Sequence, residues 1–129
     1  MKSGGGILVV DDDADLREFL RLMVTSMGFD VTCAENGQEA LNVMEGHDPD
    51  LILLDMKMPV MDGWQFCRAL EGRDARPPIV VLTAAPDPAA RAAEVCAEGW
   101  LGKPFEYADL EAIVRRFAGL RRWNTPQTP

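Results

Sequence analysis

Carboxylates follow two of the most apolar segments of this sequence, directly after residues 7–10 and 51–54. They belong to Asp11, Asp12, Asp13 and Asp55. Two unit charges about 4 Å apart repel by about 4 kcal/mol at an effective dielectric of about 20. If these groups meet, either one keeps its proton or a divalent cation binds, and oxygen ligands alone favour Mg²⁺ or Mn²⁺.

A hydroxyl and an ammonium follow two later apolar segments. Thr83 comes after residues 79–82, and Lys103 comes after the short segment Trp100-Leu101. The lysine supplies a mobile positive charge, the threonine supplies a hydrogen bond, and a carboxylate can attack in line. Together with a metal, these are the parts that phosphoryl transfer needs.

The elements that must position these groups alternate between strand and helix. Uninterrupted apolar runs predict strands covered on both faces at 7–10, 51–54 and 79–82, with weaker candidates at 31–34 and 100–101. Apolar residues spaced by three and four predict helices at 16–27, 36–45, 64–70, 87–98 and 110–120. This alternation favours an open parallel sheet, in which ligands bind beyond the carboxyl ends of the strands.

Composition narrows the classes of protein. The 129 residues fit one domain, and the net charge of −8 argues against direct DNA binding. No apolar run approaches the roughly 20 residues of a membrane span, so we expect a cytoplasmic protein without membrane contact. One histidine and three widely spaced cysteines argue against a zinc site. We expect a flexible N-terminus at 1–6, a folded domain at 7–120 and a disordered tail at 121–129.

Each polar residue also has an ordinary structural explanation. Aspartates after strands often cap the next helix, and Asp12 or Asp13 fits that role. Thr83 fits the end of a strand, and Lys103 fits a solvated surface charge. Convergence at successive strand ends favours a shared site over four independent surface residues.

Four segments, in order, carry a family resemblance: ILVVDDD at 7–13, DLILLDMKMPVMDGWQ at 50–65, IVVLTA at 79–84 and GWLGKPFE at 99–106. They resemble the receiver domains of two-component response regulators, over residues 7–120. The resemblance implies a three-layer, doubly wound (βα)5 flavodoxin-like α/β fold with a five-stranded parallel sheet in order 2-1-3-4-5.

The resemblance also implies a ligand set for the metal. Asp55 is expected to accept a phosphoryl group from a phosphohistidine donor in a Mg²⁺-dependent reaction. Asp12 and Asp55 are expected to bind the metal directly, and Asp11 largely through water. The backbone carbonyl of Lys57 is expected to complete the protein ligands.

The remaining implied residues concern the response to phosphorylation. Lys103 is expected to pair with the phosphoryl group, and Thr83 to move and hydrogen-bond it. Trp100 takes the position of the family's switch aromatic, whose movement changes the surface of the fourth helix, fifth strand and fifth helix. The peptide between Lys103 and Pro104 resembles the family's cis bond.

By this resemblance the chain catalyses its own phosphorylation and dephosphorylation and turns over no external substrate. The implied partners are a sensor histidine kinase or a histidine phosphotransfer protein, and a downstream protein target. Its state is expected to be a monomer or a phosphorylation-dependent dimer. The segment between Thr83 and Lys103 is shorter than is usual in the family. Pro86 and Pro88 fall there, so we expect the fourth helix to begin late, to be short or to be mobile.

Three rival interpretations are weaker. The Asp-x-Asp at 11–13 is similar to that of haloacid-dehalogenase-like phosphatases, but Asp55 precedes Thr83, which is the wrong order for that family's later acidic motif. A calcium loop beginning at Asp11 has Leu22 where its glutamate is required. A receiver that works without phosphorylation is the third, and every key residue of a working site is present.

Overall fold

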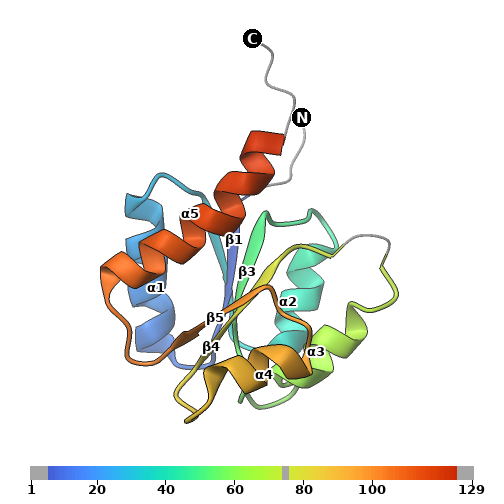
Figure 1. The fold of residues 1–129 in the computed structure, drawn as a ribbon. Helices are drawn as coiled ribbons and strands as arrows, with labels where there is room; N and C mark the ends of the chain where they lie inside the picture. The colour runs from blue at the N-terminus through green and yellow to red at the C-terminus, as the bar shows by residue number, and fades with distance from the viewer. Residues whose placement is uncertain (1–5, 74–75, 125–129) are drawn as a thin grey trace.

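A computed structural model describes residues 6–73 and 76–124, and shows strand and helix alternating five times (Figure 1). The elements are β1 (Ile7–Val10), α1 (Ala14–Ser26), β2 (Val31–Ala34), α2 (Gly37–Met44), β3 (Leu51–Asp55), α3 (Gly63–Ala69), β4 (Ile79–Thr83), α4 (Pro88–Glu94), β5 (Gly99–Gly102) and α5 (Tyr107–Asn124). All neighbouring strands pair in parallel, in the order β2-β1-β3-β4-β5. The predicted doubly wound fold is confirmed.

The sheet lies between two layers of helices. Figure 1 shows α1 and α5 on one face and α2, α3 and α4 on the other. Alternate residues of β1 divide between the layers: Ile7 and Val9 pack in the core under α1 and α5, and Leu8 and Val10 in the core under α2 to α4. Because helices cover both faces, the central strands carry no polar alternation, which is why their sequences read as uninterrupted apolar runs.

The two strands that end at candidate site residues are one residue longer than the apolar runs. Asp55 is the last residue of β3 and Thr83 is the last residue of β4. Both residues are buried, as are all the others in these strands. The polar groups are therefore fixed by the sheet itself rather than by the loops that follow.

Helix α4 is shorter than the predicted range of 87–98. The side chain of Asp87 caps it by accepting a hydrogen bond from the backbone N–H of Ala90, and Pro88 occupies the first turn, where a missing N–H costs nothing. The helix ends at Glu94, and Cys96 has a positive φ of 56°. The expectation of a short fourth helix is confirmed, and the predicted end at residue 98 is wrong.

Helix α5 continues to Asn124, past the boundary expected at residue 120. The segment 121–124, expected from the sequence to belong to a disordered tail, is helical. The rest of the predicted tail and most of the predicted flexible N-terminus lie outside the described residues. No helix in the described part of the chain is long and apolar enough to cross a membrane.

Candidate functional site

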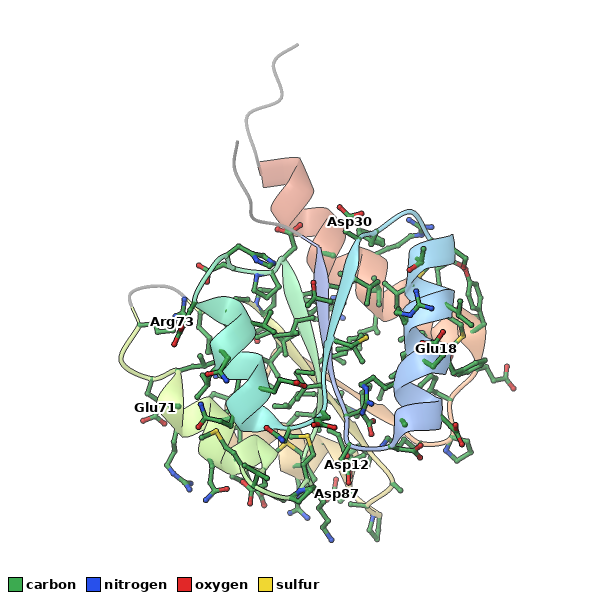
Figure 2. The ribbon with its side chains drawn as sticks, turned by 180° about the vertical axis from the view of Figure 1, so that it is seen from behind. Asp12, Glu18, Asp30, Glu71, Arg73 and Asp87 are labelled. Atoms are coloured by element: carbon green, nitrogen blue, oxygen red, sulfur yellow. The ribbon has the colours of Figure 1, made fainter. Side chains whose placement is uncertain are left out.

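Strand register brings three carboxylates together at the carboxyl edge of the sheet. Val10 lies opposite Leu54 in the β1–β3 pair, so the next residues of the two strands, Asp11 and Asp55, come level. Asp11, Asp12 and Asp55 each offer an oxygen, and these oxygens lie within 4.8 Å of one another. Figure 2 shows Asp12 at this end of the molecule. The convergence predicted from the sequence is therefore present.

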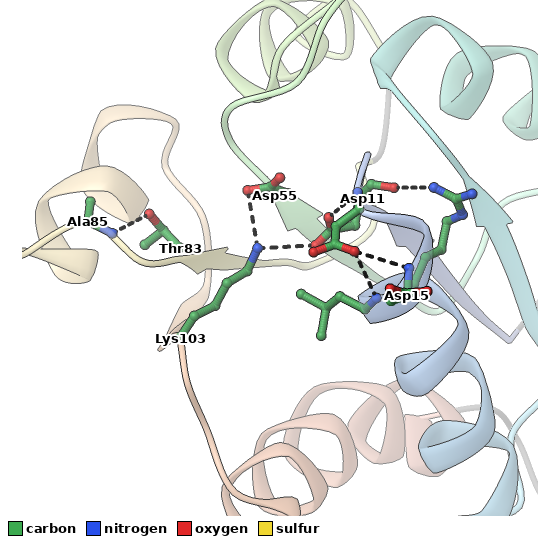
Figure 3. A network of polar contacts seen from close by, with 9 residues as sticks. Asp11, Asp15, Asp55, Thr83, Ala85 and Lys103 are labelled. Atoms are coloured by element: carbon green, nitrogen blue, oxygen red, sulfur yellow. Dashed lines mark hydrogen bonds and ion pairs between the residues drawn. The ribbon is translucent and has the colours of Figure 1, made fainter.

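The β4–β5 pair brings the hydroxyl and the ammonium to the same edge. Thr83 lies opposite Gly102, and Lys103 follows directly. The hydroxyl oxygen of Thr83 accepts a hydrogen bond from the backbone N–H of Ala85 at 3.0 Å (Figure 3). The peptide between Lys103 and Pro104 is cis, as predicted.

Lys103 forms ion pairs with two of the carboxylates. Its Nζ lies 3.2 Å from Oδ2 of Asp11 and 3.6 Å from Oδ1 of Asp55 (Figure 3). The Asp11 side chain is fully buried, whereas that of Lys103 retains 21% exposure. Lys103 therefore contacts two of the three carboxylates, and in the described part of the chain these acidic groups outnumber the cation that pairs with them.

This excess appears in the pKa of Asp55. Burial raises that pKa most, and the charge of Asp11 raises it further. Lys103 acts in the opposite direction, and a hydrogen bond and charge from Asp12 add to the increase, so that the pKa rises from 3.8 to about 6. A carboxylate that holds its proton this tightly is one that a divalent cation would relieve. Oxygen ligands without nitrogen or sulfur fit Mg²⁺ or Mn²⁺.

The acidic run after β1 divides between two roles. Asp13 is the N-cap of α1, and its Oδ1 accepts hydrogen bonds from the backbone N–H groups of Asp15 and Leu16 at 3.0 and 3.2 Å. The sequence also allowed Asp12 or Asp13 to cap the next helix, and this role is confirmed for Asp13. Asp11 and Asp12 belong to the acidic pocket.

Two further site residues lie where the sequence places them, without contacts that define a role. Trp100 in β5 is 49% exposed. Lys57 lies two residues after Asp55 in the loop that follows β3, and it is exposed. The proposed metal ligation by its carbonyl and the proposed movement of Trp100 stay predictions.

Sequence reasoning missed an arginine beside the site. Nη1 of Arg17 donates a hydrogen bond to the backbone carbonyl of Asp11 at 2.7 Å. A charged residue on the first helix gives no pattern that distinguishes it from a solvated side chain. The one available signal is that Arg17 lies one helical turn after the cap, Asp13, and therefore near the edge of the sheet.

An apolar pocket beside Lys103 was also missed. Its lining residues come from α1 and from the loops after β4 and β5: Asp13, Leu16, Phe19, Ala84, Lys103, Pro104 and Phe105. Phe19 has the helical spacing of a core residue, yet 51% of it is exposed. Periodicity identifies the apolar stripe of a helix but does not show which residues of that stripe stay exposed.

Comparison with known proteins agrees with this geometry. The model of the response regulator receiver domain family matches residues 7–115. This chain belongs to that family. The receiver is 40% identical over 122 residues to the response regulator MprA of Mycolicibacterium vanbaalenii, an alignment that covers 93% of this chain and 52% of that protein. The chain spans about half the length of the curated relatives it matches.

Solved receiver structures share the fold. One is the response regulator TrrA of Thermotoga maritima in complex with Mg²⁺ and BeF, with a TM-score of 0.78 and 29% identity, covering 89% of this chain and 99% of that one. Another is the receiver domain of a sensor histidine kinase of Pseudomonas aeruginosa, with a magnesium ion coordinated in its active-site cleft. Its TM-score is 0.81 at 31% identity, covering 91% of this chain and 99% of that one. Receiver domains act in two-component signalling with histidine kinases.

Proposed function

We propose that this receiver accepts a phosphoryl group on Asp55 from a phosphohistidine of a sensor histidine kinase or a histidine phosphotransfer protein. The observation that carries the proposal is the meeting of three carboxylates within 4.8 Å, with the ammonium of Lys103 lying 3.6 Å from Asp55. The raised pKa of Asp55 is the electrostatic sign of that crowding. Two solved relatives support it, one in complex with Mg²⁺ and BeF and the other with magnesium coordinated in its active-site cleft.

The chain's residues fit Mg²⁺ as the metal. Asp11, Asp12, Asp55 and the carbonyl of Lys57 would hold it, with Mn²⁺ as a substitute. When bound, the ion neutralises negative charge on the carboxylates and on the oxygens of the transferring phosphoryl group. The fit rests on the all-oxygen donor set.

In the proposed step, a carboxylate oxygen of Asp55 forms a bond to phosphorus as the bond between phosphorus and the imidazole nitrogen breaks. The electron pair of the broken bond stays on the imidazole, which leaves with the donor. The Lys103 ammonium, now shared between Asp11 and Asp55, then pairs with a phosphoryl oxygen. The hydroxyl of Thr83 gives up its contact with Ala85 and donates to another phosphoryl oxygen.

The position of Thr83 supports a proposal for the response to phosphorylation. Thr83 ends β4, which pairs with β5, and β5 carries Trp100. Thr83 and the half-exposed indole of Trp100 therefore lie on neighbouring strands. We infer that the ring turns inward when Thr83 moves and changes the surface formed by α4, β5 and α5. A downstream protein target would read that surface.

The apolar pocket supports a docking site for the phosphohistidine donor. It lies directly beside the acidic site, because both share Lys103. Phe19 and Phe105 offer it aromatic surface, and half of Phe19 is accessible. A protein docked there would present its phosphohistidine toward Asp55.

The test is phosphoryl uptake followed by intact mass. With Mg²⁺ and a small phosphodonor such as acetyl phosphate, the native protein should gain one acid-labile phosphoryl group, and a chelator should prevent the gain. Asp55→Asn should gain none, whereas Asp48→Asn, a change at an exposed carboxylate paired with Arg73, should behave as the native protein does. A gain that persists in Asp55→Asn would place the site elsewhere.

Trp100 supplies a second signal in the same experiment. In a variant with Trp64 and Trp123 replaced by phenylalanine, the emission of Trp100 should change on phosphorylation, because the ring moves out of water. Unchanged emission alongside full phosphoryl uptake would remove the switching part of the proposal. If the native protein takes up no phosphoryl group, a receiver that works without phosphorylation becomes the better interpretation.

A further inference from the structure

We infer that Arg17 is a positioning residue that holds the Asp11–Asp12 peptide so that the acidic pocket can bind its divalent cation. The inference rests on the proposed function of Asp55 as a Mg²⁺-dependent phosphoryl acceptor. Its basis is the part-buried hydrogen bond of 2.7 Å from Nη1 of Arg17 to the backbone carbonyl of Asp11.

With this bond, every polar atom of Asp11 is engaged. Its N–H donates to the carbonyl of Ala34 at 3.1 Å, and its Oδ1 accepts from the N–H of Asp13 at 2.9 Å. Its Oδ2 lies 3.2 Å from Nζ of Lys103. Asp11 is also fully buried. Without Arg17, the carbonyl would be the one polar group of Asp11 that none of these contacts satisfies. Arg17 supplies its partner.

Fixing the carbonyl of Asp11 also orients Asp12. The two residues share a peptide unit, which is planar, so the position of the carbonyl oxygen sets the direction of the N–Cα bond of Asp12. Asp12 is exposed, while its carboxylate contributes to the cluster of oxygens within 4.8 Å. Arg17 therefore limits the directions from which this exposed carboxylate can approach the pocket.

Arg17 and Lys103 act on Asp11 in different ways. Lys103 contacts the carboxylates themselves, and its ammonium can move to pair with a phosphoryl group on Asp55. Arg17 instead donates a hydrogen bond to the backbone carbonyl. Its hold on the peptide is therefore unchanged when Lys103 moves away. The backbone of Arg17 is itself fixed in the first turn of α1. The N–H of Arg17 donates to the carbonyl of the cap residue, Asp13, at 2.9 Å.

The experiment compares two arginines on the same helix. Arg17→Ala removes the bond to Asp11, and Arg21→Ala removes an equal charge from a residue that instead pairs with Glu18 on the exposed side of α1. The dissociation constant for Mg²⁺ is measured by calorimetry at constant ionic strength. The pH is held above the pKa of Asp55, which is about 6, and the temperature is held well below the unfolding temperature of each variant.

The affinity of Arg17→Ala for Mg²⁺ should fall about tenfold, as is usual when a residue that orients a metal ligand is lost. Arg21→Ala should keep the native affinity. The Mg²⁺ concentration that gives half-maximal phosphoryl uptake should rise by the same factor in Arg17→Ala, with most of the rate recovered at saturating Mg²⁺. A purely structural role would lower stability but leave the affinity of the folded protein unchanged.

Native affinity in Arg17→Ala overturns the inference, and so does an equal loss in both variants, since that would be an effect of net charge. If Arg17→Ala does not fold, Arg17→Gln gives the same comparison, because its neutral and shorter side chain does not replace the guanidinium. If the native protein takes up a phosphoryl group and Arg17→Ala binds Mg²⁺ with native affinity, this inference is wrong and the proposed function stands. If the native protein binds no Mg²⁺, both this inference and the proposed function are wrong.

Discussion

Replacing Asp55 with asparagine should stabilise the metal-free domain at neutral pH. Asparagine keeps the size of the side chain and removes a charge that burial and Asp11 disfavour. The pKa of Asp55 rises from 3.8 to about 6, and each pKa unit corresponds to about 1.4 kcal/mol, so the ionised carboxylate costs the fold about 3 kcal/mol. The side chain is only 12% exposed, so solvent does little to screen this cost.

The sign of the pH dependence follows from the direction of the shift. Below pH 3.8, Asp55 is protonated in both the folded and the unfolded chain, and the substitution removes no charge. Between pH 3.8 and about 6 the unfolded chain releases this proton while the folded domain keeps it, so the native protein loses stability as the pH rises. Above about pH 6 the full cost is present. The advantage of Asp55→Asn should therefore grow across this window and then level off.

Urea denaturation followed by circular dichroism measures this difference in the presence of a chelator. The free energies of unfolding of the native protein and of Asp55→Asn are compared at several pH values on both sides of the window. Asp48→Asn is the control at an exposed carboxylate. Saturating Mg²⁺ should stabilise the native protein and narrow the gap, because a ligand that binds only the folded state adds its binding free energy to stability.

Equal stability of the native protein and Asp55→Asn at neutral pH would refute the electrostatic account of the pocket. So would an advantage that is already complete below pH 3.8, since that would be an effect of packing and not of charge. Either result would mean that mutual repulsion does not drive a cation into this cluster of carboxylates.

Two predictions concern the loop after β3 and the first residue of α3. Val60→Asn should stabilise the domain by about 1 kcal/mol in urea denaturation, because Val60 is 78% exposed with a positive φ of 69°, which asparagine tolerates better; no change would mean that the turn is not strained. Gly63→Ala should destabilise it by about 2 kcal/mol, because an added Cβ would lie 2.6 Å from Sδ and 2.8 Å from Cα of Met56. Native stability in Gly63→Ala would show that Met56 shifts to make room without cost.

Most of the fold was predictable because its signals are local. The uninterrupted run at Ile7–Val10 indicates a strand covered on both faces, and three such runs separated by helical patterns leave few arrangements besides a parallel sheet. Helix ends were less predictable. Leu120 is the last residue of the apolar stripe predicted from the sequence, but no helix breaker follows until Pro126, and α5 continues to Asn124.

The site divides in the same way between local and tertiary causes. The meeting of Asp11 and Asp55 follows from where parallel strands end, so the sequence could predict it. The contact of Arg17 with a backbone carbonyl could not be predicted, because it depends on the reach of a long side chain and leaves no spacing pattern. Nor does periodicity show that Phe19, which is spaced like a core residue, lines a pocket and stays half-exposed.

The destabilisation of Asp55 and its proposed reactivity share the same causes, which are burial and the charge of Asp11. As the last residue of β3, Asp55 is fixed beside Asp11 by the register of the sheet, and it cannot move away to relieve the repulsion. A carboxyl group with a raised pKa keeps its proton at a pH where an exposed one has lost it, and it can attack only after that proton has left. A cation that takes the proton's place yields the ionised form at a lower pH. The arrangement that lowers the stability of the metal-free domain therefore favours metal binding, and metal binding favours attack.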